Sequence, residues 1–223
     1  AKGTSIVNVI DVEKEEKVTS VISVNGFFEN EYLTMVTKKG VIKRTLLSAY
    51  EYQRKGGKIA INLDEGDELL YVVHTKGGEN LILATREGNA VRFCEENVRS
   101  MGRTARGVRG ISLRGDDYVT GVAIVDEDKK LATITENGFG KRTEVEEYRA
   151  QSRAGKGILT YKTTEKTGHI IGVKVVTDND DVMIITATGV IIRINVSDIS
   201  VLGRNTQGVT LMRTSEGGRV VNI

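Results

Sequence analysis

Residues 81–93 read LILATREGNAVRF. Apolar residues alternate on both sides of the segment Thr-Arg-Glu-Gly, a pattern typical of a β-hairpin that turns on a glycine. The same pattern recurs as LTMVTKKGVIKRT at 33–45, LATITENGFGKRT at 131–143 and VMIITATGVIIRI at 182–194. The chain is therefore built on an internal repeat whose centre is a hairpin.

Two glycines keep the repeats in register. The turn glycines are Gly40, Gly88, Gly138 and Gly189, at steps of 48, 50 and 51 residues. A second glycine follows them by 17, 19, 19 and 19 residues, at Gly57, Gly107, Gly157 and Gly208. A period of this size, with short strands and glycine turns, indicates β-sheet blades that are arranged radially.

Each repeat is expected to contain about four short strands. In the second repeat these would lie at 68–75, 80–86, 89–95 and 108–114. Helical periodicity is nearly absent, so we predict an all-β fold with about four complete blades and part of another. The chain is predicted to be a single domain, 1–223, with units at 1–16 (partial), 17–66, 67–116, 117–166 and 167–223. SIVNVI at 5–10 aligns with KIAINL at 58–63 and GISLRG at 110–115, so the chain is expected to start inside an array.

Composition excludes several classes of protein. With 39% apolar and 28% charged residues in 223 positions, the chain resembles a folded soluble domain. The longest apolar stretch, 182–192, is shorter than the ~18 residues that a membrane-spanning helix needs. The N-terminal segment also lacks the apolar region of a signal peptide. We therefore expect a cytoplasmic protein with no membrane partner.

No group of residues indicates catalysis or metal binding. The single cysteine, Cys94, excludes an internal disulfide and a multi-cysteine zinc site, and it is expected to fill the core. His74 and His169 lie far apart in the sequence, with no serine or cysteine motif beside either. We expect no catalytic residue, no metal and no cofactor in this chain.

Cations recur at fixed distances from the two glycines. An arginine follows each turn glycine by four residues, and strand alternation predicts that these four arginines lie on equivalent blade faces. Other cations surround the second glycines, whereas acids gather in different segments, so the formal net charge of +2 conceals a basic rim. The predicted DNA-contacting residues are Lys43, Arg44, Arg54, Lys55, Lys58, Arg92, Arg103, Arg106, Arg109, Lys141, Arg142, Arg153, Lys156, Arg193 and Arg204.

A basic rim of this kind favours duplex DNA as the ligand. A row of cations can follow a phosphate backbone, which carries roughly one negative charge per 1.7 Å of duplex. Aromatic residues make up only 5% of the chain, fewer than a single-strand binder or a base-reading protein would use. We expect contacts to the backbone and bending, without sequence preference. The alternative is that the cations are ordinary solvated side chains that protect exposed strands from edge pairing. This alternative does not predict an arginine at the same offset in all four repeats.

Three phrases resemble a known family. MGRTARGVRGISL at 101–113, GFGKRTEVEEY at 138–148 and VLGRNTQGVTLMRT at 201–214 look like the C-terminal domain of the A subunit of DNA gyrase, a type IIA topoisomerase. The last phrase favours gyrase over the related A subunit of topoisomerase IV. The resemblance implies a six-bladed β-pinwheel whose blades exchange strands, and DNA wrapped in a right-handed sense around its basic rim. ATP-driven strand passage would then introduce negative supercoils.

The resemblance also implies partners and a signature. The partners would be the remainder of the gyrase A protein, together with the gyrase B protein, in a heterotetramer that uses ATP and Mg²⁺ outside this chain. The family signature Gln-Arg-Arg-Gly-Gly-Lys-Gly is matched at 53–58, except that Lys55 is a conservative change, and Ile59 replaces the final glycine. We interpret this segment as a degenerate copy in the third of six blades. A chain lacking the first blade and most of the second should bind DNA but wrap it poorly.

Two other functions fit the repeat. A propeller that binds proteins would need an exposed apolar or aromatic patch, which the low aromatic content does not favour. A propeller enzyme that depends on a metal or acts on carbohydrate would need converging carboxylates. The acids lie instead at repeat-spaced positions in connecting loops, where we expect them to be solvated.

Overall fold

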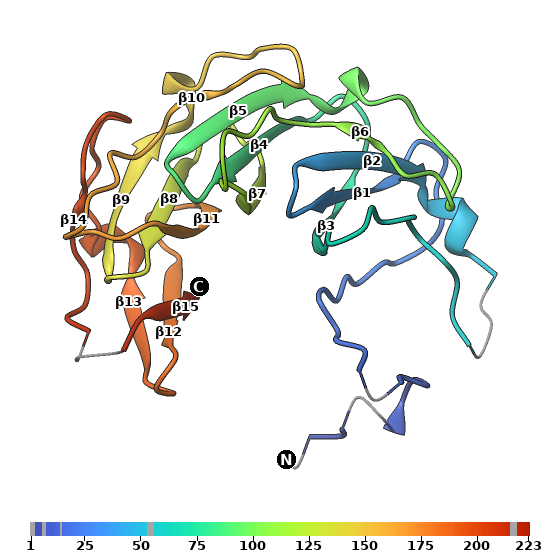
Figure 1. Ribbon diagram of the computed structural model, residues 1–223, viewed down its shortest axis with the longest axis horizontal. Helices are drawn as coiled ribbons and strands as arrows, with labels where there is room; N and C mark the ends of the chain where they lie inside the picture. The colour runs from blue at the N-terminus through green and yellow to red at the C-terminus, as the bar shows by residue number, and fades with distance from the viewer. Residues whose placement is uncertain (1–2, 6–7, 14, 53–55, 215–217) are drawn as a thin grey trace.

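Four antiparallel β-sheets stand side by side along an open arc (Figure 1). The computed structural model describes residues 3–5, 8–13, 15–52, 56–214 and 218–223. Three of the sheets have four strands and the last has three, and short 3₁₀ turns follow the hairpins. The predicted all-β, propeller-like fold is therefore confirmed. None of the helices described is long and apolar enough to cross a membrane.

A β-hairpin forms the centre of each sheet. In all four hairpins the threonine of Thr-x-x-Gly is buried, and its Oγ1 accepts the N–H of the residue four positions later, at 3.1–3.3 Å. The following glycine has positive φ, which closes the turn without steric strain. The hairpin strands are β1 (Tyr32–Thr37) with β2 (Val41–Leu46), β4 (Asn80–Thr85) with β5 (Asn89–Cys94), β8 (Lys130–Thr135) with β9 (Phe139–Glu144), and β12 (Asp181–Thr186) with β13 (Ile191–Asn195).

Strands from later in the chain complete each hairpin on its edges. On the inner side of the arc lie β3 (Leu69–Thr75), β7 (Val119–Ile124), β11 (Ile170–Val176) and β15 (Val220–Asn222). On the outer side lie β6 (Val108–Arg109), β10 (Ile158–Leu159) and β14 (Val209–Thr210). The sheet orders are β3-β1-β2-β6, β10-β5-β4-β7, β11-β8-β9-β14 and β13-β12-β15. The 3₁₀ turns are η2 (Leu47–Tyr50), η3 (Glu95–Asn97), η4 (Val145–Glu147) and η5 (Val196–Asp198).

The strands of one sequence repeat do not share one sheet. Of the four strands predicted in the second repeat, β4 and β5 form the second hairpin, whereas β3 and β6 complete the first sheet. The segment KIAINL, 58–63, forms no strand, although it alternates like one. The later outer strands pair with the hairpin of the preceding repeat, and the described residues before β1 form no hairpin. Part of SIVNVI, residues 6–7, lies outside the described residues.

Both glycines of the repeat lie at the joint between a hairpin and its outer strand. The carbonyls of Gly40, Gly88 and Gly138 each accept a backbone N–H from the chain beyond the outer strand, at 2.8 Å. A Cβ on Gly88 would overlap the carbonyl oxygen of Tyr161. On the other side of the same joint, a Cβ on Gly157 would lie 2.7 Å from the carbonyl oxygen of Ala90. The two anchors seen in the sequence are therefore the two sides of a backbone-to-backbone contact.

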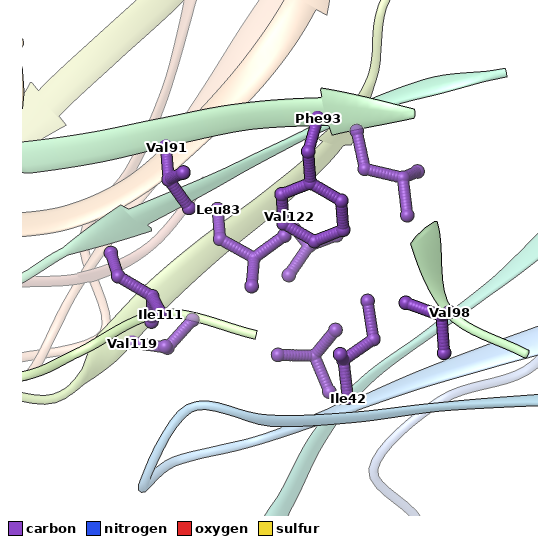
Figure 2. Packing of buried hydrophobic residues seen from close by; sticks show 10 residues of the cluster. Ile42, Leu83, Val91, Phe93, Val98, Ile111, Val119 and Val122 are labelled. Carbon is purple, nitrogen blue, oxygen red and sulfur yellow. The ribbon is translucent and has the colours of Figure 1, made fainter. Parts of the chain in front are cut away.

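The hydrophobic core lies between neighbouring sheets. In β4, Leu81 and Leu83 pack towards the first sheet, whereas Ile82 packs towards the third. Figure 2 shows the first interface, where Phe93 and Leu83 meet residues of the first sheet. A sheet that is covered on both faces has apolar residues at successive positions, which explains the uninterrupted run LILA in β4.

Alanine substitutions at two turn glycines would measure how much this joint contributes to the free energy of unfolding. Gly88 and Gly189 both have positive φ, but only Gly88 has backbone packed against it, since nothing lies within 4 Å of a Cβ on Gly189. We expect Gly189→Ala to lower the free energy of unfolding by about 1 kcal/mol, through backbone strain alone. Gly88→Ala should cost at least about 2 kcal/mol more, because the outer strand must shift. Equal urea midpoints for the two variants would contradict this.

Candidate nucleic-acid interface

Three loops of similar conformation lead into the outer strands, on the convex side of the arc (Figure 1). They span residues 101–107, 151–157 and 202–208, and we call them the rim loops. Each ends at one of the second glycines with positive φ. The corresponding segment of the first repeat includes residues 53–55, which lie outside the described residues. The match of Gln53, Arg54 and Lys55 to the family signature therefore stays a prediction.

The predicted DNA-contacting residues divide into surface and interior positions. Exposed are Arg106, Arg109, Lys156 and Arg193; half-buried are Lys58, Arg92, Arg103, Arg153 and Arg204; buried are Lys43, Arg44, Lys141 and Arg142. Arg54 and Lys55 are not among the described residues. The four buried residues lie on the second strands of the first and third hairpins, β2 and β9.

Of the four arginines that follow a turn glycine by four residues, three bind other groups of the protein. Arg142 donates from Nε to the carbonyl of Ile199 at 2.6 Å, beside the turn η5, and forms an ion pair with Asp178. Arg92 donates from Nη1 to the carbonyl of Tyr148, at 3.2 Å, beside η4. Each of these two arginines therefore fixes the 3₁₀ turn of the next repeat to its own hairpin.

Arg44 is also internal, whereas Arg193 lies on the surface. Arg44 lies 3.4 Å from the carboxylate of Glu95, which is fully buried and also accepts from the Thr75 hydroxyl at 2.6 Å. The side chains of Arg44, Arg92 and Arg142 are 10%, 10% and 6% exposed, against 73% for Arg193. The four arginines predicted to lie on equivalent blade faces and to contact DNA are therefore not equivalent, because the next repeat covers Arg44, Arg92 and Arg142 and leaves Arg193 exposed.

Two buried lysines hold the rim loops from inside. Lys141 Nζ donates to the carbonyls of Gly203 at 2.8 Å and Arg204 at 2.6 Å. Lys43 Nζ donates to the carbonyls of Ala60 and Arg103. Burial, and to a smaller extent a nearby arginine charge, lowers the pKa of each lysine from 10.5 to about 8. At Lys141 the Glu147 carboxylate opposes this decrease in pKa.

An arginine in each rim loop bonds to the outer strand region of the preceding repeat. Arg103 donates to the carbonyl of Ile59 at 2.9 Å, and Arg204 donates to the carbonyl of Leu159 at 2.7 Å. Arg153 makes the same bond to the carbonyl of Arg109, at 3.1 Å. These guanidinium groups connect successive loops along the outer edge, so the edge is continuous from repeat to repeat.

A basic hollow of about 520 Å³ lies between the first two rim loops. Lys39, Arg106, Arg109 and Arg153 line it, and Asp64 is the one acid in its lining, paired with Arg106. Four cations against one carboxylate leave a positive potential in a concave surface, which attracts an anion such as a phosphate group.

Several exposed cations beside these loops were not predicted from the sequence. They lie just before the loops or just after the outer strands, and they are Arg99, Arg114, Arg149, Lys162 and Arg213. A usable signal was present, since Lys162 and Arg213 each follow a second glycine by five residues. Around the second glycines, the prediction included only cations within four residues of the glycine.

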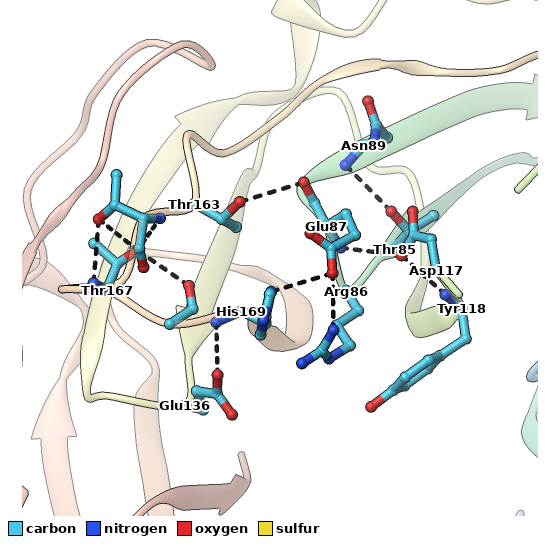
Figure 3. Close-up of polar contacts among 12 residues, drawn as sticks. Thr85, Arg86, Glu87, Asn89, Asp117, Tyr118, Glu136, Thr163, Thr167 and His169 are labelled. Atoms are coloured by element: carbon cyan, nitrogen blue, oxygen red, sulfur yellow. Dashed lines mark hydrogen bonds and ion pairs between the residues drawn. The ribbon is translucent and has the colours of Figure 1, made fainter. Parts of the chain in front are cut away.

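Asp117 and His169 contact the hairpin turn that contains Glu87 (Figure 3). Asp117 Oδ1 accepts the backbone N–H groups of Glu87 and Tyr118, at 3.0 and 2.9 Å. His169 Nδ1 lies 3.3 Å from a carboxylate oxygen of Glu87. These acids therefore cap turns rather than simply meeting solvent. Among the described residues, no three or more of His, Cys, Asp and Glu come together in a way that could hold a metal ion.

These features define a propeller-like β-domain with exchanged strands and a basic outer edge. The family described as DNA gyrase C-terminal domain, β-propeller, matches residues 31–76, 79–126, 129–177 and 180–223, so that each match spans one hairpin and its inner strand. The chain belongs to this family.

Individual relatives agree with this assignment. The A subunit of DNA gyrase from Salmonella typhimurium strain LT2 is 44% identical over the whole chain, and that from Clostridium acetobutylicum is 48% identical over 99% of it. The chain spans 25% and 27% of the length of these two relatives. The solved C-terminal domain of DNA topoisomerase IV superposes with a TM-score of 0.91 at 31% identity, covering 98% of this chain and 69% of that one. A solved DNA gyrase A C-terminal domain has the same fold, with a TM-score of 0.90 at 23% identity, covering 100% and 74%.

The buried arginines should matter for stability. We expect Arg142→Ala to lower the free energy of unfolding by about 2 kcal/mol, because it leaves the Ile199 and Ser197 carbonyls without their donor. Arg193→Ala removes an exposed ion pair and should change it by less than about 0.5 kcal/mol. Chemical denaturation of both variants checks this, and equal losses would contradict the internal role.

Lys141 should make stability depend on alkaline pH. Between pH 8 and 10.5 the unfolded chain holds a proton on this lysine that the folded chain has lost, so raising the pH favours folding in that window. Each full proton changes the free energy of unfolding by about 1.4 kcal/mol per pH unit. The Lys141→Met variant should show a smaller rise than the parent, whereas the exposed Lys174→Met control should follow the parent curve. Parallel curves for Lys141→Met and the parent would refute the assignment.

Proposed function

We propose that this chain binds duplex DNA without sequence preference and bends it around the outer edge of the arc. The observation that carries the proposal is the recurrence of exposed cations on and beside the rim loops. Arg109 and Lys156 are exposed at this edge, and neither forms an ion pair within the described part of the chain. Unpaired surface cations can neutralise phosphates without first giving up an internal partner.

The shape of the edge supports bending. The rim loops follow one another along a convex surface (Figure 1), and Arg103, Arg153 and Arg204 tie each loop to the repeat before it. A duplex that follows a convex basic surface must bend, and the gain in phosphate contacts offsets the deformation energy. Because the contacts are to backbone, the preference would be for deformable sequences rather than for a base motif.

Membership in the family supports the proposal that this activity serves a larger enzyme. DNA held on the rim would be presented to the strand-passage part of DNA gyrase, which uses ATP to introduce negative supercoils. The partners would be the remainder of the gyrase A protein and the gyrase B protein, in a heterotetramer in the bacterial cytoplasm. The chain itself would contribute DNA wrapping and no catalytic group, with ATP and Mg²⁺ bound elsewhere.

The dependence of affinity on salt tests the proposal. For a random duplex of about 40 base pairs, the slope of log affinity against log salt should fall by about 0.9 for each phosphate contact removed. We expect this decrease for Arg109→Ala and for Lys156→Ala. Lys174→Ala removes the same charge from the inner strand β11 and should leave the slope unchanged. An equal decrease for Lys174→Ala would indicate binding by net charge and not by the outer edge.

A further inference from the structure

The buried lysines orient the backbone of the rim loops. In loop 202–208, Lys141 Nζ donates hydrogen bonds to the carbonyls of Gly203 and Arg204, and it also donates to the carbonyl of Thr206 at 3.3 Å. The lysine side chain is fully buried, so it cannot itself touch DNA. Three carbonyls of one exposed loop thus point into the protein.

Peptide geometry then fixes the direction of the neighbouring N–H groups. A trans peptide points its C=O and the following N–H in opposite directions, and the described chain contains no cis peptide. The N–H groups of Asn205 and Gln207 follow carbonyls that point at Lys141, so they point away from it. Both residues are exposed, and neither N–H has an acceptor in the part of the chain that the structure describes.

A neighbouring N–H of the same loop already binds an anionic oxygen. The carbonyl of Gly203 points at Lys141, and the following N–H, that of Arg204, donates to Glu147 Oε2 at 3.0 Å. The outward side of this loop is therefore suited to oxygen anions, as expected where successive N–H groups face one way. Glu147 is the acid that a further anion would meet there.

Each of the other two rim loops also turns a backbone N–H group outward. In loop 101–107, Lys43 holds the carbonyl of Arg103, which turns the N–H of the exposed Thr104 outward. Loop 151–157 differs, because it has Val91 where the other two have a lysine, and a backbone N–H orients one of its carbonyls instead. The Ser112 N–H donates to the carbonyl of Gly155 at 2.9 Å, which turns the N–H of Lys156 outward.

We propose that these outward backbone N–H groups bind phosphodiester oxygens of the duplex, and that Lys43 and Lys141 are the positioning residues that direct them. The inference rests on the proposed function and names the groups that contact the ligand. Backbone donors suit a ligand bound without sequence preference, because they contact only what every nucleotide shares. They are also fixed before binding, so little conformational entropy is lost when the phosphate arrives.

A matched pair of variants at one residue isolates the N–H group. Asn205→Pro removes the N–H, whereas Asn205→Ala keeps it, and both remove the same side chain without changing the charge. Relative to Asn205→Ala, we expect Asn205→Pro to bind a 40-base-pair duplex about fivefold to tenfold more weakly. Equal affinities of the two variants would overturn the proposal.

Amide NMR shifts test the same groups without altering the loop. On titration with the duplex, and separately with inorganic phosphate, the amide protons of Asn205 and Gln207 should move downfield. Lys141→Met should reduce these shifts and weaken duplex binding about fivefold, whereas Lys174→Met, with the same charge change, should do neither. Shifts that are as large in Lys141→Met as in the parent would overturn the positioning role.

The two probes separate this inference from the proposed function. If the parent chain binds no duplex at low salt, the proposed function fails, and the titration with inorganic phosphate alone decides whether the N–H groups form an anion site. If the duplex binds but the amides of Asn205, Gln207 and Thr104 do not respond to it, the function stands and the inference is overturned.

Discussion

The structure depends on one contact, the joint between a hairpin turn and a strand that arrives from a later repeat. The carbonyl of a turn glycine accepts an N–H from the arriving chain, and a second glycine lets that chain lie against the hairpin backbone. Neither position leaves room for a Cβ where the joint is formed, as at Gly88 and Gly107. The joint sets the position of the outer strand in the three described sheets that have one, and it also places the loops that precede these strands on the convex edge.

Charge serves two purposes on the two sides of this joint. Inside it, Arg142 and Lys141 bind carbonyls of the following repeat, so a cation replaces part of the hydrophobic contact between repeats. Outside it, Arg109 and Lys156 are exposed on the edge. The interior cations fix the shape of the edge, and the exterior cations give it a positive electrostatic potential. A basic surface needs both features to bind a stiff polyanion along one defined path.

The fold was predictable because the joint is recorded locally in the sequence. Gly88 and Gly107 are required by the backbone at their own positions, and their 19-residue spacing recurs in the two later copies. The burial of Arg92 and Arg142 could not be predicted from the sequence, because it depends on 3₁₀ turns that lie some 50 residues later in the chain. Lys141 and Lys156 are both lysines, but Lys141 lies on β9 with its side chain buried, whereas Lys156 lies exposed in a rim loop. The apolar alternation at 58–63 is typical of a strand, but no strand forms there. A strand must also pair with the edge of a neighbouring strand, and the pattern alone does not show whether such an edge is present.

Exchange of strands also bears on how such a domain can change over time. Each repeat gives its neighbours the same kinds of strand that it receives, so a copy inserted in register would form every joint without a new interface. Gain or loss of one repeat would lengthen or shorten the arc by one sheet and leave the chemistry of the edge intact. Under the proposed function, gene duplication would therefore change the length of DNA bound by one repeat at a time, without altering the residues that contact it.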